Sequence, residues 1–318
     1  MDQPKQSADA PSPGLVAGRQ FLEKILRPLT TFKSPGVAES VLEEYNATIT
    51  PLDFASGQPV NNAPTLLCPM DRAVVRGAID EIKPWMQLNE DGGFYNYEPV
   101  LEFFRYEPYY HYRNADHFAN TVHTYLMLYQ DEESPGYLLS RTSWDNGGAE
   151  CVLPWLRYFH EDVYKWQLLD AFIHLLPYKP RPTPKPRLPS ELHTPTPREP
   201  CPDPRKPHVI CHTVDSTPWM AGVLRTSEFK TILFIAGANK FKPAFEASDH
   251  FAVTVLSFWN WEVRIVQGLV NFKTLALDIR VSSPQSFRDG IRNDDGSIDP
   301  RFLTLLGYNC GEVLPLST

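Results

Sequence analysis

The stretch YKPRPTPKPRLPSELHTPTPREPCPDPRKP, residues 178–207, has eleven prolines in thirty positions. A proline has no backbone N–H, so it cannot serve in the interior of a helix or in a central strand. We therefore expect this segment to run as polyproline II or irregular coil on the surface. Its seven Lys and Arg outnumber its three Asp and Glu, which makes it the only basic part of the chain.

Three roles are open for this segment. It could be a plain linker between two folded regions, which is the role we favour. It could be a ligand of an SH3-like or WW-like domain, because PxxP occurs at Pro177–Pro180 and Pro186–Pro189, although neither has a basic residue at the usual SH3 spacing. It could also lie as a basic strap on the first half of the chain, where 24 Asp and Glu outnumber 13 Lys and Arg.

The chain of 318 residues is longer than most single domains, which have roughly 100–200 residues. A hydrophobic content of 42% and a charged content of 21% are those of a globular protein. We expect a disordered tail (1–13), a helix-rich acidic region (14–177), a basic proline-rich linker (178–207) and a β-rich α+β region (208–318). Because the net charge is −8 and the first half is acidic, nucleic acid is not an expected partner.

Targeting signals and cysteines bear on the compartment. The first 13 residues contain acids and prolines instead of the apolar core of a secretory signal. The longest apolar runs, such as 251–259, fall short of the roughly 18 residues that cross a bilayer as a helix. The five cysteines are odd in number and never spaced as CxxC, unlike a disulfide framework. We expect a soluble intracellular protein, cytoplasmic or nuclear, that does not contact a membrane.

Apolar residues at helical spacing predict helices in the first region. The predicted helices span 18–29, 34–45, 71–83 and 152–176. The second would begin at Ser34 and Pro35, and the third would end before Pro84. The segment 121–143 is ambiguous, because its pattern fits a β-hairpin and, nearly as well, a helix that begins near Asn114.

Short runs rich in β-branched and aromatic residues predict strands in the second region. They span 208–214, 231–236, 251–259, 261–266 and 274–281. Tight connections at Asn260 and near Asn271 would join three of them as a meander, and Asp299 with Pro300 would cap a final helix to residue 308. The predicted fold class is α+β: a helix-rich N-terminal region and a mainly antiparallel C-terminal sheet joined by the proline-rich segment. The two regions could pack as one body.

Asp215, Glu228 and Lys230 are the catalytic candidates. Two converging carboxylates can hold Mg²⁺, and a nearby lysine can activate water for phosphodiester cleavage. On a strand, Glu228 and Lys230 would share one face. In these three residues alone the chain resembles the D…(D/E)xK pattern of one nuclease superfamily, but here the ExK triplet precedes an apolar run instead of ending one. Ordinary surface charges explain the three residues equally well.

Two other groups could bind a metal. Cys201, His208, Cys211 and His212, with His193 upstream, have the side chains of a structural zinc site. Because neighbours on a strand point to opposite faces, Cys211 and His212 argue against it. We predict no metal site and no cofactor, with Mg²⁺ required only by a nuclease.

The segment DHFANTVH, 116–123, would place Asp116, Asn120 and His123 on one face if it is helical. That face could hold a metal or supply a general base. A polar helix face in water has the same pattern.

The segment 94–112 contains nine Phe or Tyr in nineteen positions. Tyrosine combines a large apolar ring with a polar tip, which suits a protein interface or a small-molecule pocket. Packing in the core is the plainer interpretation. The candidate binding residues here are Arg105, Tyr109, Tyr110, Tyr112 and Arg113.

No GxxxxGK[ST], GxGxxG, GxSxG or HExxH motif is present in the sequence. This absence does not exclude an enzyme. Together with the motif-like content of the proline-rich segment and the aromatic, acidic patch, it leads us to expect a non-catalytic binding or adaptor protein that acts through protein–protein contacts. Two alternatives stay open: a divergent metal-dependent nuclease or phosphodiesterase that uses Asp215, Glu228 and Lys230, and a small-molecule enzyme with a tyrosine-lined pocket.

Overall fold

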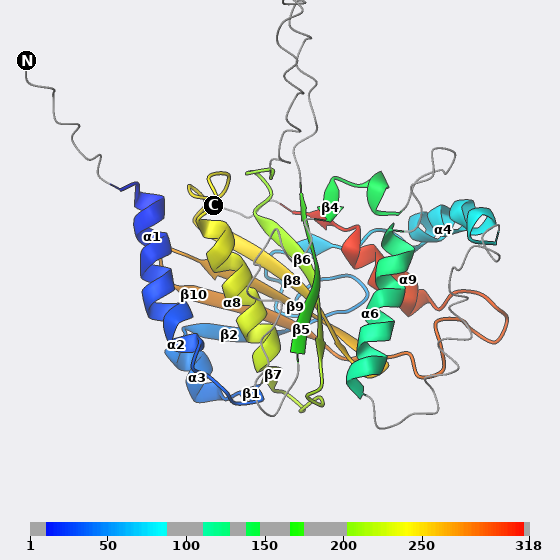
Figure 1. Ribbon diagram of the computed structural model, residues 1–318, viewed down its shortest axis with the longest axis horizontal. Helices are drawn as coiled ribbons and strands as arrows, with labels where there is room; N and C mark the ends of the chain where they lie inside the picture. The colour runs from blue at the N-terminus through cyan, green and yellow to red at the C-terminus, as the bar shows by residue number, and fades with distance from the viewer. Residues whose placement is uncertain (1–10, 88–110, 128–137, 147–165, 175–201, 315–318) are drawn as a thin grey trace, which may run out of the picture.

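The computed structural model describes residues 11–87, 111–127, 138–146, 166–174 and 202–314. Its centre is an eight-stranded mixed sheet with the order β2-β10-β9-β8-β6-β5-β4 and β11 beside β9 (Figure 1). The strands are β2 Ala47–Leu52, β4 Trp144–Asn146, β5 Trp166–His174, β6 His208–Asp215, β8 His250–Trp259, β9 Glu262–Asn271, β10 Ala276–Ser282 and β11 Gln285–Ser286. Among the strand pairs of the described residues, only β2/β10 and β6/β8 are parallel. The α+β fold class is confirmed.

Helices cover both faces of this sheet (Figure 1). They are α1 Pro13–Phe21, the π-helix η1 Leu22–Leu26, α2 Arg27–Leu29, α3 Glu39–Glu44, α4 Arg72–Gln87, α6 His111–Met127, the 3₁₀-helix η2 Leu139–Arg141, α8 Thr226–Lys240 and α9 Pro300–Asn309. Two small sheets complete the fold, and they pair β1 Gly36–Val37 with β7 Leu224–Arg225 and β3 Leu67–Cys68 with β12 Glu312–Val313. Within the described residues no helix is long and apolar enough to cross a membrane.

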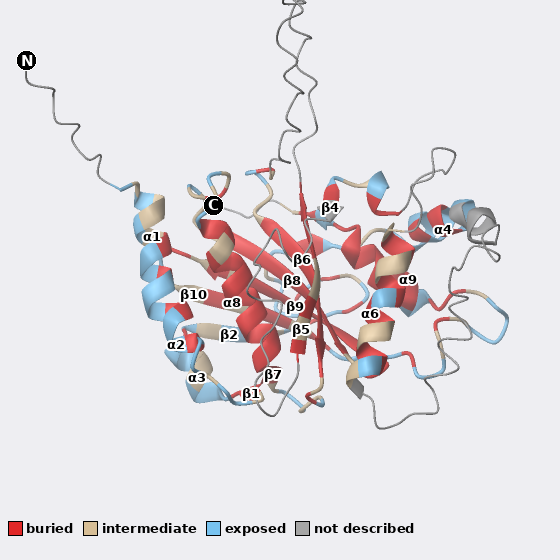
Figure 2. Cartoon of the chain, in the orientation of Figure 1, coloured by how far each residue is buried: buried red, intermediate tan, exposed pale blue. Residues whose placement is uncertain are grey.

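The sheet separates two hydrophobic clusters. Val253 and Val255 of β8 face the cluster under α1 and α8, whereas Leu256 and Phe258 face the cluster under α4, α6 and α9. Successive side chains of a strand point to opposite faces, so a strand covered on both sides is apolar at nearly every position. The buried colouring of the central strands in Figure 2 shows this double cover.

Residues on both sides of the proline-rich segment build the same sheet. Strand β5 precedes the segment, β6 follows it, and the two are antiparallel neighbours with Phe172 opposite Ile210. Strand β2, also from the first region, pairs with β10. The two regions therefore pack as one body, which the sequence left open. The segment itself, up to residue 201, lies outside the described residues.

Several predicted elements are correct. Residues 18–29 are helical, with a π-helical turn in the middle. The strands predicted at 208–214, 251–259, 261–266 and 274–281 correspond to β6, β8, β9 and β10. Asn260 has a positive φ of 53° in the turn between β8 and β9, as a tight hairpin connection requires. Asp299 caps α9 by accepting a hydrogen bond from the Arg301 backbone N–H.

Other predicted elements are wrong. Residues 231–236 belong to α8 and not to a strand, because α8 is buried on nearly all sides and an apolar run of six cannot distinguish the two. Residues 166–174 form β5 instead of continuing a helix; 152–165 lie outside the described residues.

Helix bounds near two prolines also differ from the prediction, and the structure decides part of the ambiguous segment. Pro35 does not begin a helix, because Gly36–Val37 pairs with β7 and α3 starts only at Glu39. Helix α4 continues past Pro84 to Gln87, since a proline disfavours but does not forbid helix before it. The ambiguous segment is helical as far as Met127, in α6.

Close packing of α8 on the sheet gives a first prediction. A Cβ at Gly268 of β9 would lie 2.4 Å from Cγ2 of Ile232 in α8. We expect Gly268→Ala to lower the free energy of unfolding by about 1–3 kcal/mol in urea titrations, through overpacking. Gly77→Ala on exposed α4, where a Cβ meets nothing within 4 Å, is the control, and it should raise stability by about 1 kcal/mol or less. Equal stabilities of the two variants would contradict the packing argument.

Candidate functional site

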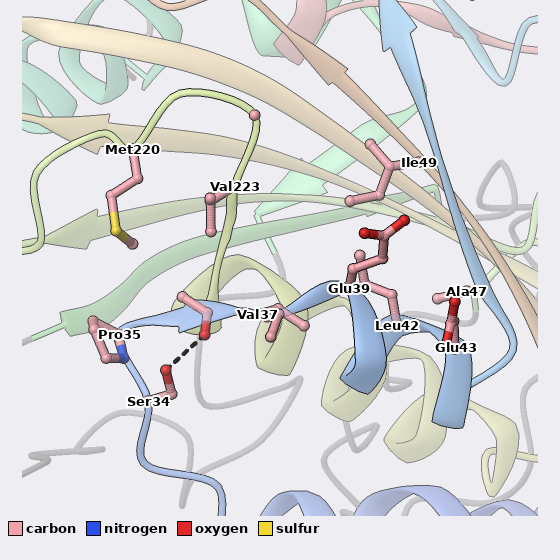
Figure 3. A pocket seen from close by; sticks show the side chains of 13 residues that line it. Ser34, Pro35, Val37, Glu39, Leu42, Glu43, Ala47, Ile49, Met220 and Val223 are labelled. Carbon is pink, nitrogen blue, oxygen red and sulfur yellow. Dashed lines mark hydrogen bonds between the residues drawn. The ribbon is translucent and has the colours of Figure 1, made fainter.

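An open cavity of about 770 Å³ lies between β1, α3, β2 and the loop before β7. Figure 3 shows its side chains: α3 and β1 form one wall, Ile49 comes from β2, and Met220 and Val223 come from the loop. It is lined by Ser34, Pro35, Gly36, Val37, Ala38, Glu39, Leu42, Glu43, Ala47, Ile49, Met220, Gly222 and Val223. The loop reaches the cavity because β7 pairs with β1.

The cavity combines an apolar surface with two carboxylates. Ile49 is 38% exposed, a large value for an isoleucine on a sheet. Glu39 and Glu43 lie four residues apart on α3, and neither has an ion-pair partner among the described residues. Two like charges at this spacing repel each other slightly. Among the described residues, the cavity therefore presents apolar contact area beside negative charge that no cation neutralises.

Strand β2 is the outer strand of the sheet beside this cavity. The Leu277 N–H of β10 donates to the Asn46 carbonyl, and the parallel register then directs the backbone groups of Thr48 and Thr50 toward β10. The N–H and C=O of Ala47 and Ile49 point away from the sheet. Beyond them Val60 N–H bonds the Pro51 carbonyl, so a loop covers the next position. The open backbone and the cavity share Ala47 and Ile49.

The predicted catalytic residues lie elsewhere. Asp215 ends β6, where its Oδ1 accepts from the Thr217 backbone N–H at 2.7 Å and its Oδ2 accepts from Ser227 Oγ. Lys230 lies in α8 and donates from Nζ to the Phe32 carbonyl at 2.5 Å. Both side chains are buried, and their polar atoms are directed at these hydrogen-bond partners within the chain.

Glu228 lies in the first turn of α8 with no exposed surface. Its two carboxylate oxygens accept from Nε and Nη2 of Arg264 at 2.8 and 2.5 Å, and Arg225 Nε is 3.5 Å away. Burial opposes ionisation, but the two guanidinium groups outweigh it and lower the pKa of Glu228 to about 2. A carboxylate held by two arginines has no free position for Mg²⁺.

Asp215, Glu228 and Lys230 therefore do not converge on an open cleft. The prediction that Glu228 and Lys230 share a strand face is wrong, because both are helical. The geometry gives the nuclease alternative no support.

The zinc candidates are also dispersed. Cys211 faces the cluster under α8, and His212, its neighbour on β6, faces α6 and α9. His208 bonds Thr254 Oγ1 through Nε2 at 2.8 Å. Cys201 and His193 lie outside the described residues. In the described part of the chain no three His, Cys, Asp and Glu side chains are placed to hold a metal.

One residue of the predicted helix face of Asp116, Asn120 and His123 contacts an acidic side chain of the sheet. His123 Nδ1 lies 3.0 Å from Asp170 Oδ2, and His212 Nδ1 lies 3.6 Å from the same oxygen. A register shift between Leu168 and Asp170 in β5 turns Asp170 toward α6. The sequence missed Asp170 because its segment was assigned to a helix, and a bulge leaves no periodic signal.

Hydrogen bonds of α9 orient His212 beside Asp170. Asn309 Nδ2 donates to the Leu305 carbonyl, so its Oδ1 faces His212 Nε2 at 2.6 Å and accepts from it. Burial opposes ionisation of Asp170, but the two imidazoles outweigh it and hold its pKa well below the usual range. A proton on His123 Nδ1 leaves Nε2 as an acceptor, which suits an acid–base group. His123 is not among the residues that line the cavity.

The aromatic candidates are only partly described. The Tyr112 hydroxyl donates to Gln167 Oε1 at 2.8 Å. Burial, followed by the charges of Asp116 and Asp215, raises the pKa of Tyr112 to about 12. Arg113 is exposed on α6. Arg105, Tyr109 and Tyr110 lie outside the described residues, so a tyrosine-lined pocket stays a prediction.

Comparison with known proteins adds no relative: no family model, curated protein or solved structure matches the chain.

Proposed function

We propose that this chain is a non-catalytic binding or adaptor protein that acts through protein–protein contacts, and that the cavity beside β2 is a contact site. The observation that carries the proposal is found at one place: an open apolar cavity, two carboxylates and a sheet edge, and within the described part of the chain neither the carboxylates nor the edge has a partner. Partner recognition uses apolar area for affinity and polar groups for orientation. A contact of the proline-rich segment with an SH3-like or WW-like domain stays a separate prediction.

The polar groups of the cavity favour binding over catalysis. Ser34 Oγ donates to the Gly36 carbonyl and has no imidazole in the cavity lining to activate it. The other ionisable groups of the lining are the two glutamates. The side chains of Asp215, Glu228 and Lys230 are bonded to other groups of the same chain in its interior, where they stabilise the fold.

The test is a selection of random linear peptides of about ten residues, long enough to form a strand of ordinary length, on the immobilised full chain. We expect enriched peptides to bind the wild type and to lose at least tenfold in affinity for Ile49→Asp, because a carboxylate in the apolar cavity must be desolvated. Binding is measured by fluorescence anisotropy.

Val74→Asp is the matched control. Val74 is an exposed valine of α4, 56% exposed and not part of the cavity lining. This variant should bind like the wild type. If no peptide is enriched, or if the two aspartate variants bind equally well, the proposed contact site is wrong.

A further inference from the structure

We propose that the partner of this cavity is an extended, basic peptide segment that pairs with β2 as an added strand and places a Lys or Arg between Glu39 and Glu43. This inference rests on the proposed function and specifies its ligand. Three observations on the described residues carry it: the open backbone of β2, the alternation of its side chains, and the charge of Glu39 and Glu43, for which they supply no ion-pair partner.

The backbone of β2 can accept a new strand only at Ala47 and Ile49. Their N–H and C=O groups point away from β10, whereas those of Thr48 and Thr50 are directed toward it. An exposed strand edge of this kind is a template for pairing with another chain. Adding a strand here would use up to four backbone hydrogen bonds, which contribute affinity whatever the ligand's side chains are.

Side-chain alternation places ligand residues over the cavity. Ala47 and Ile49 both line the cavity, so their side chains share one face of β2. In a strand paired beside them, every second side chain lies on that same face. Those side chains would contact Leu42, Val223 and Ile49, which favours apolar β-branched residues at these positions.

The charge of Glu39 and Glu43 favours a basic residue in the ligand. The carboxylates of Glu39 and Glu43 lie one helical turn apart beside the cavity, without a cation among the described residues. A Lys or Arg between them would form an ion pair with each and relieve their mutual repulsion. An acidic peptide would be repelled.

The basic segment 178–207 has a charge that suits the two glutamates, but its prolines do not suit pairing with β2. Eleven of its thirty residues are prolines, which have no N–H to donate to β2. We therefore expect a synthetic peptide of residues 178–207 to bind the cavity more weakly than a basic, proline-free strand.

The experiment uses the peptides enriched by the selection on the full chain. We expect them to contain Lys or Arg among β-branched residues and to lack internal proline. N-methylation of every second amide should abolish binding in one frame and spare it in the other, because only alternate amides face β2. Glu39→Gln combined with Glu43→Gln should weaken binding roughly tenfold at low salt, and this difference should vanish in about 1 M salt.

Controls separate this inference from the proposed function. Glu23→Gln removes an exposed glutamate of η1 outside the cavity lining and should leave affinity unchanged. If the peptides depend on Ile49 but tolerate N-methylation in both frames, or ignore the glutamates, the strand model fails while the binding function stands. Tighter binding of the 178–207 peptide also overturns the strand model. Absence of any Ile49-dependent peptide overturns both.

Discussion

Replacing Glu228 with alanine is expected to lower the free energy of unfolding by about 3–5 kcal/mol. The carboxylate forms ion pairs with both Arg264 and Arg225 in the interior, and all three side chains are at least nine-tenths buried. Both guanidinium groups stack on Trp219, with Cζ 3.6 and 4.5 Å from its centroid, so neither can easily swing into water. Glu228 also accepts the backbone N–H of Arg225 and thereby caps α8. Its removal leaves two buried cations with incomplete partners.

Urea unfolding at neutral pH measures this effect. Asp249→Ala, which breaks the exposed Lys273–Asp249 pair, is the control and should cost about 1 kcal/mol or less. The double variant Glu228→Leu with Arg264→Met should be more stable than Glu228→Ala, because it removes a buried charge together with its partner. A cost for Glu228→Ala as small as that of the control would contradict the structural role assigned to this network.

The stability of the protein is expected to fall steeply as the pH drops from about 6 to 5. Burial is the largest cause that lowers the pKa of both His174 and His208 to about 3. The charge of Lys206 contributes to the lowered pKa of His174, and a charge on His174 does the same for His208. An unfolded histidine has a pKa of about 6.5. Between pH 6.5 and 3 the unfolded state therefore binds more protons, and each histidine destabilises the fold by about 1.4 kcal/mol per pH unit. Above pH 6.5 both states are neutral and the effect is absent.

The measurement is a series of urea titrations at pH 7, 6 and 5. His208→Gln should reduce the loss between pH 6 and 5 by about half, since one of the two titrating groups is gone. His250→Gln is the control, because His250 is only half-buried and bonds Asn271 at the start of β8. A slope unchanged in His208→Gln would show that this residue is already protonated in the folded state.

The candidate site was largely beyond sequence analysis. Glu39, Glu43, Ala47 and Ile49 have no unusual spacing, and Met220 and Val223 lie 171 to 184 residues further along the chain. They meet because β1 pairs with β7 and β2 pairs with β10. A sequence motif records neighbours along the chain, whereas this cavity depends on long-range strand pairing.

The sequence by itself determined the α+β class, the meander of β8, β9 and β10, the turn at Asn260 and the cap of α9, because period-two alternation, turn residues and capping residues act locally. Only the tertiary structure decided that 231–236 is helix, that 166–174 is strand and that both sides of the proline-rich segment share one sheet. An apolar run buried on all sides satisfies helix and strand equally, and the choice then falls to the packing partners that cover it.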